Sequence, residues 1–336
     1  MMRQYQQERI MEAELRRIAG QYFSPETIES VKVFKNRAIV TLVNAIEDPA
    51  KAEAMEQALK ALPEIEKVSV VYTAARRDEG DTRWRIPGVK KIIAVASGKG
   101  GVGKSTTAVN LALALADLGQ KTALFDADIY GPSVPTMLGF EDVSPISYDG
   151  KTFEPFENLG LKSMSIGSLV AKDTPLIWRG PKACGALQQL LTEVNWGEID
   201  VMVIDMPPGT GDIQITLAQQ VKLDGAVIVS TPQDIALIDA VKGVNMFKRV
   251  EVPILGIIEN MSYYLCPKCG HKEFVFGEHG ARETAERLGE KFLGEIPLNI
   301  KIRSYADGGT PIVYAEPEST FSDAYREIAA KVLERL

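Results

Sequence analysis

The chain has 336 residues, more than one average domain, so we expect two folding units. Hydrophobic residues make up 45% of it and charged residues 25%, a composition that excludes a disordered or collagen-like chain. The net charge of -7 at pH 7 supplies no overall positive field that would attract the protein to nucleic acid or to an anionic membrane. We therefore expect neither as a partner.

The cysteine content and the first residues bear on the compartment. Three cysteines are too few, and odd in number, for a disulfide framework, which indicates a reducing compartment with thiols that are free or bind metal. The opening MMRQYQQERIMEAELRR carries charges where a signal peptide would be apolar, and no run approaches the roughly 18 apolar residues of a membrane span. We expect a soluble, cytoplasmic protein.

The first segment of the chain predicts a small α+β domain over residues 1–74. An amphipathic helix is followed by the strands VKVF and AIVTLV, separated by the turn residues Lys35-Asn36-Arg37. A second helix, opened by Asp48-Pro49, precedes the strand KVSVVY. Its apolar face consists of Ala52, Met55, Leu59 and Leu62. Residues 75–89 are charged, contain Gly and Pro and show no period, which predicts a linker.

Residues 90–336 predict a second, larger domain of the α/β class. Short continuous apolar runs, IIAVAS, TALFDAD, VMVIDM, AVIVSTP and ILGIIENM, alternate with helical stretches such as 104–118 and 234–248. Continuous apolar strands are buried on both faces, and their alternation with helices indicates right-handed βαβ units. We predict a doubly wound, mostly parallel sheet, with ligands bound beyond the carboxyl ends of its strands.

A glycine-rich segment, GKGGVGKS from Gly98 to Ser105, directly follows the strand IIAVAS and opens a helix, which is the context that a P-loop requires. Its backbone N–H groups and the helix N-terminus can surround phosphates. Lys104 would reach the outer phosphates, and Ser105 would ligate magnesium. The predicted nucleotide contacts in this segment are Gly98, Lys99, Gly100, Gly101, Val102, Gly103, Lys104, Ser105 and Thr106.

Three aspartates end two of the predicted strands. Asp205 ends VMVID and has the place of a carboxylate that holds magnesium, often through water. Asp126 and Asp128 end TALFDAD, and Asp128 is the better placed to orient a hydrolytic water. For Asp128 and Asp205 the alternative role is capping of the following turn. The Gly and Pro residues of 207–211 would allow that loop to respond to a γ-phosphate.

The pair Cys266 and Cys269, in CPKCG, follows the strand ILGIIENM. Two thiolates complete neither a zinc tetrahedron nor a four-cysteine [4Fe-4S] cluster. One solution is zinc bound within the chain by the two cysteines together with His271 and His279. Another is a twofold dimer, in which the cysteines of both copies face one labile metal centre. A metal-free turn is the third interpretation.

Together, GKGGVGKST, DADIYGPS and DMPPGTGD resemble the deviant Walker-A P-loop ATPases, a group that includes MinD and ParA proteins, nitrogenase reductase and the Mrp/ApbC iron-sulfur carriers. Residues 90–336 are similar to the Mrp-type carriers, which have RGP near 179–181, GALQQ near 185–189 and a C-x-x-C in these relative places. The resemblance implies an ATPase that uses ATP and Mg²⁺. It also implies a homodimer whose Cys266 and Cys269 bind a bridging [4Fe-4S] cluster for apoprotein recipients, with scaffold proteins as candidate donors.

The resemblance implies further residue roles. Lys99 would cross the dimer interface to the partner's nucleotide, as a cation supplied in trans, and Asn260 would hydrogen-bond adenine, the alternative being a satisfied turn asparagine. Cys184, where the family often has no cysteine, is expected in the core. The first domain resembles the metal-sulfur cluster assembly domain that often precedes such ATPases. Because it lacks that domain's cysteine signature, we expect a recipient-docking or regulatory role.

An alternative function is a MinD- or ParA-like positioning ATPase that acts on membrane or DNA and uses the C-x-x-C as a structural zinc site. The C-terminal FSDAYREIAAKVLERL has apolar residues at helical spacing, as a membrane-surface helix would. It lacks the lysine-rich polar face of such anchors, so we expect the stripe to face the core. A nitrogenase-reductase-like electron donor is disfavoured, because that class places its two cysteines far apart.

Overall fold

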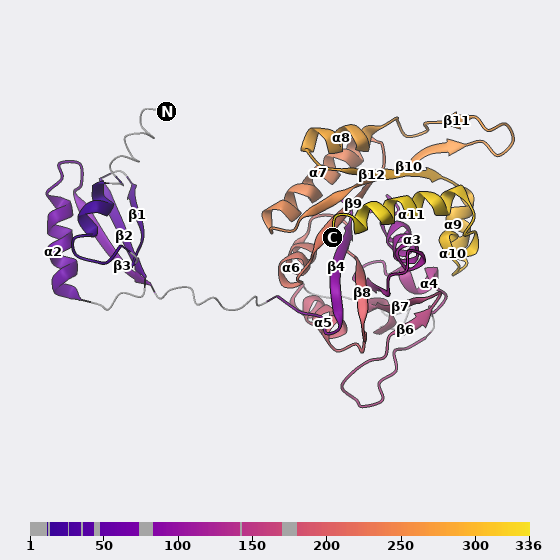
Figure 1. Ribbon diagram of the computed structural model, residues 1–336, viewed down its shortest axis with the longest axis horizontal. Helices are drawn as coiled ribbons and strands as arrows, with labels where there is room; N and C mark the ends of the chain where they lie inside the picture. The colour runs from indigo at the N-terminus through magenta and orange to yellow at the C-terminus, as the bar shows by residue number, and fades with distance from the viewer. Residues whose placement is uncertain are drawn as a thin grey trace. The chain divides into compact units, whose positions relative to one another are not determined.

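The structure is a computed structural model that describes residues 12, 14–25, 27–34, 36–43, 48–73, 83–141, 143–169 and 180–336. The chain divides into two compact units, Met1–Thr82 and Arg83–Leu336 (Figure 1). Each unit has hydrophobic clusters of its own.

The smaller unit is built on a three-stranded sheet. Strand β1 (Ile28–Phe34) pairs antiparallel with β2 (Arg37–Val43), which pairs parallel with β3 (Lys67–Thr73). Helix α2 (Pro49–Lys60) begins where the Asp48 side chain accepts a hydrogen bond from the Lys51 amide, and Pro49 occupies a first-turn position that needs no donor. The core of the smaller unit includes Leu15, Ala19, Val40, Leu42, Met55 and Leu59. The predicted order of helix, two strands, helix and strand is observed in the described residues.

The larger unit contains a sheet of nine strands among the described residues, in the order β11-β10-β9-β4-β8-β5-β7-β6, with β12 paired to β10. Neighbouring strands are parallel except at the β6–β7 and β10–β11 pairs. The strands are β4 (Val89–Ala96), β5 (Thr122–Asp126), β6 (Phe156–Asn158), β7 (Leu161–Ser165), β8 (Ile199–Asp205), β9 (Gly225–Ser230), β10 (Ile254–Leu265), β11 (Lys272–Glu273) and β12 (Phe292–Leu298). The mostly parallel α/β sheet confirms the predicted fold class.

Helices cover both faces of this sheet, because its strands are apolar on both sides. In β4, for example, Ile92 and Ala94 belong to one hydrophobic cluster and Ile93 and Val95 to the other. The first cluster includes residues of α5 (Gly180–Thr192), α6 (Asp212–Gln220), α7 (Asp234–Arg249) and α8 (Gly280–Leu288). The second includes residues of α3 (Lys104–Asp117), α4 (Val134–Met137), α9 (Ile300–Asp307), α10 (Ile312–Ala315) and α11 (Thr320–Leu333).

The C-terminal helix α11 packs against α3 and β12. Its apolar stripe is buried, since Tyr325, Ile328 and Val332 are at most 1% exposed. The stripe is therefore a core face, as expected, and is not available as a membrane-surface helix. In the part of the chain that the structure describes, no helix is both long and apolar enough to cross a membrane.

The last part of the predicted linker, residues 83–89, belongs to the larger unit. Residues 74–82 lie outside the described residues, but Trp84 forms a β-bridge with Val221, and Ile86 is 4% exposed within a hydrophobic cluster of the larger unit. The chain thus joins this unit before β4 begins.

Candidate nucleotide site and cysteine hairpin

The glycine-rich loop connects β4 to α3 at the carboxyl edge of the sheet. Gly101 and Gly103 have φ values of 84° and 79°, a left-handed conformation that favours glycine. A Cβ at Gly98 would lie 2.1 Å from the carbonyl carbon of Asp239 in α7, so this position admits no side chain. No side chain of the described residues caps α3, which begins at Lys104, and its first N–H groups are therefore available to an anion.

Lys104 brings together residues from three segments that are distant in the sequence. Its side chain is 6% exposed, and Nζ lies 2.6 Å from Oδ1 of Asp205 and 3.7 Å from Oδ2 of Asp128. Nζ also donates a hydrogen bond of 3.1 Å to Oγ of Ser105. The lysine, the serine and two of the three predicted aspartates thus share one buried polar site.

Asp205 pairs with Lys104 through one carboxylate oxygen and leaves the other without a partner among the described residues. It is fully buried at the end of β8, and its Oδ2 atom has no hydrogen-bond partner among the residues that the structure describes. Burial raises the pKa of Asp205, while the ammonium of Lys104 acts in the opposite direction. A buried, unpartnered carboxylate oxygen close to a serine hydroxyl suits a hard cation such as Mg²⁺, or a water bound to it.

Asp126 supports the loop that carries Asp128. Its buried carboxylate accepts hydrogen bonds from the amides of Asp128 at 3.0 Å and Val134 at 3.2 Å, and from Oγ of Ser165 at 3.0 Å. Burial and the nearby charge of Asp205 raise the pKa of Asp126 to about 7. Asp126 therefore holds the backbone of the segment between β5 and α4 in place through these hydrogen bonds.

Asp128 fills the turn-capping role that the sequence offered for it, and its action on a hydrolytic water stays a prediction. Its Oδ1 atom accepts from the amides of Tyr130 and Gly131, both at 3.2 Å, so it closes the following turn. Its Oδ2 atom faces Lys104. The side chain is thus held at the site by backbone contacts and keeps one oxygen directed toward it.

The loop after β8 is tied to the start of the P-loop. The amide of Gly209, with φ of 90°, donates to the carbonyl of Ser97 at 3.0 Å, and Oγ of Ser97 donates to the carbonyl of Lys99 at 2.8 Å. Lys99 itself is partly exposed. Sequence reasoning did not identify Ser97, because a serine that ends a strand carries no motif of its own.

Asn260 lies directly behind the P-loop. It is 6% exposed, and its Nδ2 donates a hydrogen bond of 2.8 Å to the carbonyl of Val102. A Cβ at Gly103 would approach this Nδ2 to 2.2 Å. In the structure the Asn260 amide therefore supports the loop, and its contact with adenine stays a prediction.

The cysteine pair occupies the turn of the β10–β11 hairpin, which projects from the body of the larger unit (Figure 1). Two backbone hydrogen bonds of 2.9 Å, from Cys266 N to His271 O and from Gly270 N to Cys266 O, close the turn. Cys266 is partly exposed and Cys269 is exposed. The amides of Cys269 and Lys268 lower the pKa of the Cys266 thiol, which favours the thiolate that metals bind.

The four-ligand zinc site within one chain is not formed. His271 pairs with Glu273 at 3.1 Å, while the ring of His279 lies 3.4 Å from Glu278 and 3.5 Å from Glu295. Within the described ranges no three Cys, His, Asp or Glu side chains are arranged to hold a metal ion. Cys184, on α5, is only partly buried, contrary to the expected core position.

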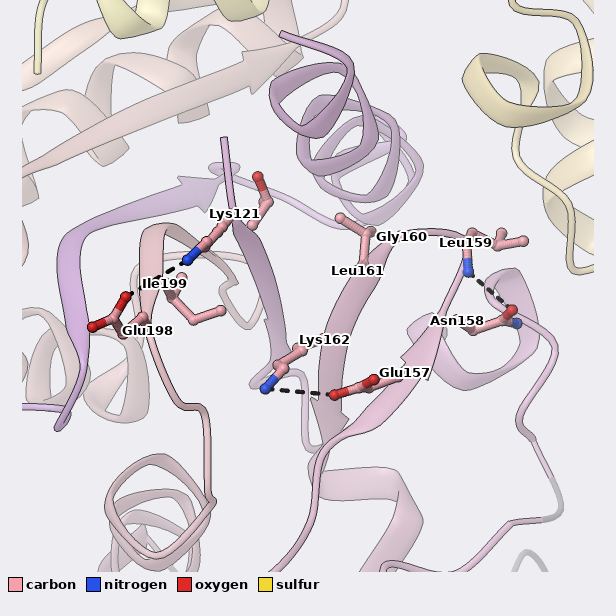
Figure 2. A pocket seen from close by; sticks show the side chains of 10 residues that line it. Lys121, Glu157, Asn158, Leu159, Gly160, Leu161, Lys162, Glu198 and Ile199 are labelled. Atoms are coloured by element: carbon pink, nitrogen blue, oxygen red, sulfur yellow. Dashed lines mark hydrogen bonds and ion pairs between the residues drawn. The ribbon is translucent and has the colours of Figure 1, made fainter. Parts of the chain in front are cut away.

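A pocket of about 440 Å³ lies at the opposite edge of the sheet, at the amino ends of β5, β7 and β8 (Figure 2). Its charged side chains are paired, Lys121 with Glu198 at 3.6 Å and Lys162 with Glu157 at 3.4 Å. None of the predicted site residues lines it. The nucleotide site is therefore identified by its loop and its polar side chains.

Comparison with known proteins identifies close relatives of the larger unit. The chain is 58% identical over 251 residues to an iron-sulfur cluster carrier protein of Salmonella typhimurium, which covers 75% of this chain and 68% of the relative. It is 50% identical over 256 residues to the iron-sulfur cluster transfer protein NUBPL of Mus musculus, covering 75% of this chain and 79% of the relative.

Solved structures show the same fold. A nucleotide-binding protein in complex with ADP from Archaeoglobus fulgidus superimposes with a TM-score of 0.63 at 38% identity, over 74% of this chain and 97% of that one. The cell division ATPase MinD of Pyrococcus furiosus, at 20% identity and a TM-score of 0.54, shares the fold. The family model of the NUBPL iron-transfer P-loop NTPases, in the ParA group, matches residues 88–333. On this match the chain belongs to the NUBPL-type iron-transfer P-loop NTPases.

Proposed function

We propose that this protein is an ATP-hydrolysing carrier that holds a [4Fe-4S] cluster between two copies of the chain and transfers it to apoproteins. The observation that carries the proposal is a pair of thiols, one partly exposed and one exposed, on a hairpin that continues β10, the strand whose Asn260 contacts the P-loop. The names of relatives that are 50% to 58% identical, cluster carrier and cluster transfer proteins, support it.

The polar site supplies the groups that ATP hydrolysis needs. Binding of the outer phosphates would require Lys104 to exchange a carboxylate partner for a phosphate oxygen, within reach of the α3 N-terminus. Ser105 and Asp205 would hold Mg²⁺, which would neutralise charge on the phosphates. Asp128, held by the amides of its turn, would orient the attacking water. Lys99 would act on the nucleotide of the partner copy, and Asn260 would contact adenine.

The cysteine hairpin supplies half of a cluster site. Two thiolates from each of two copies complete the four ligands of a [4Fe-4S] cluster, and a twofold axis places them on one centre. The exposure of Cys269 leaves such a cluster accessible to a recipient. The amides that lower the pKa of Cys266 would stabilise negative charge on its sulfur.

Exposed apolar side chains favour a second copy as the partner at this edge. Several large ones lie at or after the carboxyl ends of β5, β9, β10 and β12, namely Tyr130, Ile235, Ile238, Leu265 and Ile300. Apolar side chains grouped on one edge are typical of a protein interface. Burial of these residues would bring two P-loops and two cysteine hairpins together.

The proposal is tested by anaerobic reconstitution with iron and sulfide, followed by absorption spectroscopy, iron and sulfide analysis and measurement of the molecular mass. The wild-type protein should take up one [4Fe-4S] cluster per two chains and deliver it to an apoprotein. The Cys266→Ala, Cys269→Ala double variant should take up none, whereas Cys184→Ala, the matched control, should behave as wild type. Stoichiometric zinc in the isolated protein without iron uptake, or a cluster bound by the double variant, would contradict the proposal.

A further inference from the structure

A buried carboxylate that the sequence analysis did not identify lies between the nucleotide site and the cysteine hairpin. Glu259 is 0% exposed in β10 and adjoins Asn260. Its Oε1 accepts a hydrogen bond of 2.6 Å from Oγ of Ser262, and its Oε2 accepts one of 2.6 Å from the amide of Ala281. In the described chain no Lys, Arg or His forms an ion pair with it. Its partners are two neutral donors, one of which is an amide at the N-terminus of α8.

These two hydrogen bonds join the ends of one segment. We define residues 262–281 as the cysteine arm, because they include β11 and the turn with Cys266 and Cys269. The arm starts at Ser262 and ends at Ala281 in the first turn of α8. A single side chain therefore connects the entry and the exit of the arm.

Of the residues that follow Glu259, Asn260 contacts the P-loop and Met261 lies near it. Asn260 donates to the carbonyl of Val102, and a Cβ at Gly103 would lie 3.7 Å from Cε of Met261. Met261 has φ of 55°, a left-handed backbone conformation that is uncommon for residues other than glycine and asparagine. Pairing of β10 with β12 is interrupted between Asn260 and Tyr264. The strand thus bends between its P-loop contact and the arm.

We call the two hydrogen bonds of Glu259, to Ser262 and to Ala281, the Glu259 clip. The clip spans this bend. A phosphate bound by the P-loop would act on the backbone around Val102 and Gly103. The Asn260 amide contacts this backbone, and the Met261 side chain lies near it. A shift of Asn260 and Met261 would move the neighbouring Glu259 carboxylate, and with it both ends of the arm, to which that carboxylate is hydrogen-bonded. Burial of a carboxylate without a cation is costly, which distinguishes this clip from an ordinary apolar contact.

We propose that Glu259 is a positioning residue that transmits nucleotide occupancy of the P-loop to the accessibility of the thiols in the cysteine arm. This inference rests on the proposed function, whose nucleotide site and cysteine pair it connects. Its test uses the thiols themselves and needs no bound cluster.

The experiment measures alkylation rates of Cys266 and Cys269 by mass spectrometry, in the full-length, cluster-free protein with Cys184→Ala. Rates are compared with and without a non-hydrolysable ATP analogue and Mg²⁺, and nucleotide affinity is measured separately. In the Cys184→Ala parent protein the analogue should change the rates by about fivefold or more, the range of ordinary allosteric coupling.

Four further variants distinguish the effect of losing the Glu259 hydrogen bonds from the effect of a general loss of stability. Glu259→Ala and Ser262→Ala should bind the analogue but respond less than about twofold, below the usual range of coupling. Glu259→Gln should respond as the parent does, since its amide can accept from the Ala281 amide and donate to Ser262. Ser322→Ala is the matched control and should also respond as the parent does. It removes a buried hydrogen bond to the carbonyl of Ile312 and a partly buried one to that of Glu316.

Two results would overturn this inference without contradicting the proposed function. One is a full response in Ser262→Ala and Glu259→Ala, and Ser262→Ala decides the matter if Glu259→Ala does not fold. The other is a parent protein that binds the analogue with no change in alkylation. Absence of nucleotide binding in the parent would instead refute the proposed function. Failure to take up a cluster, with the thiol response intact, would refute the carrier role and leave the coupling standing.

Discussion

At the scale of single residues, the site depends on one buried lysine between carboxylates. Lys104 neutralises Asp205 at 2.6 Å and approaches Asp128 at 3.7 Å, although these residues come from three separate segments. Each of them follows or ends a strand of the parallel sheet, whose carboxyl ends meet at one edge. A buried ammonium that can change partners suits a site that must accept a polyphosphate.

Replacement of Lys104 is expected to affect both binding and stability. Lys104→Ala should abolish nucleotide binding, and it should lower the free energy of unfolding by about 3 kcal/mol because it leaves buried carboxylates unpaired. Calorimetric titration with ATP and chemical denaturation measure the two effects. Lys99→Ala is the matched control, since the side chain of Lys99 is partly exposed.

Lys99→Ala should retain ATP affinity and lose at least about tenfold in hydrolysis, because a cation supplied in trans acts on the transferred phosphoryl group. Wild-type hydrolysis in Lys99→Ala would contradict the role in trans, and unchanged ATP affinity in Lys104→Ala would refute the site.

At the scale of elements, the P-loop is defined by its packing as much as by its glycines. Gly98 lies against the backbone of α7, where a Cβ would be 2.1 Å from a carbonyl carbon, whereas a Cβ at Gly100 would have no atom within 4 Å. Gly103 has its own requirement, a left-handed φ beside Asn260. The glycines of one motif thus serve different physical purposes.

This difference predicts opposite outcomes for two similar substitutions. Gly98→Ala should destabilise the protein by about 1 to 3 kcal/mol or more, as overpacking does, and weaken ATP binding because the loop must move away from α7. Gly100→Ala should leave the thermal unfolding temperature near that of wild type. Differential scanning fluorimetry with and without ATP measures both, and equal destabilisation of the two variants would contradict this account.

At the scale of the whole molecule, the chain consists of two units with separate cores. The core of the first unit is formed by residues between Leu15 and Ile65, and the clusters of the second begin at Ile86. The nucleotide site and the cysteine hairpin are both built from residues of the second unit. The site residues described above thus all belong to the second unit.

Residues 83–336 alone are accordingly expected to fold and to bind ATP and a cluster as the full chain does. Cluster transfer to a recipient should be impaired if the first unit docks recipients or regulates transfer. Circular dichroism, ATP titration and a transfer assay on both proteins provide the comparison. Loss of ATP binding in residues 83–336 would show that the division into independent units is wrong.

The sequence by itself determined the fold class and the parts of the site that have local causes. A P-loop depends on glycines at fixed spacing between one strand and one helix, so Gly98 to Ser105 could be located from the sequence, as could Asp126, Asp128 and Asp205 at strand ends. The core position of the α11 stripe could likewise be predicted, because the helix lacks the lysine-rich polar face of a membrane anchor.

Only the tertiary structure decided which distant groups meet. Three features depend on how strands and helices pack, which no local pattern encodes. They are the contact of Asn260 with Val102, the partly exposed position of Cys184 and the pairing of His279 with Glu295. The same holds for Glu259, whose partner Ala281 is 22 residues away. A buried carboxylate within an apolar strand becomes intelligible only when its hydrogen-bond donors are known, because burial without them would be too costly.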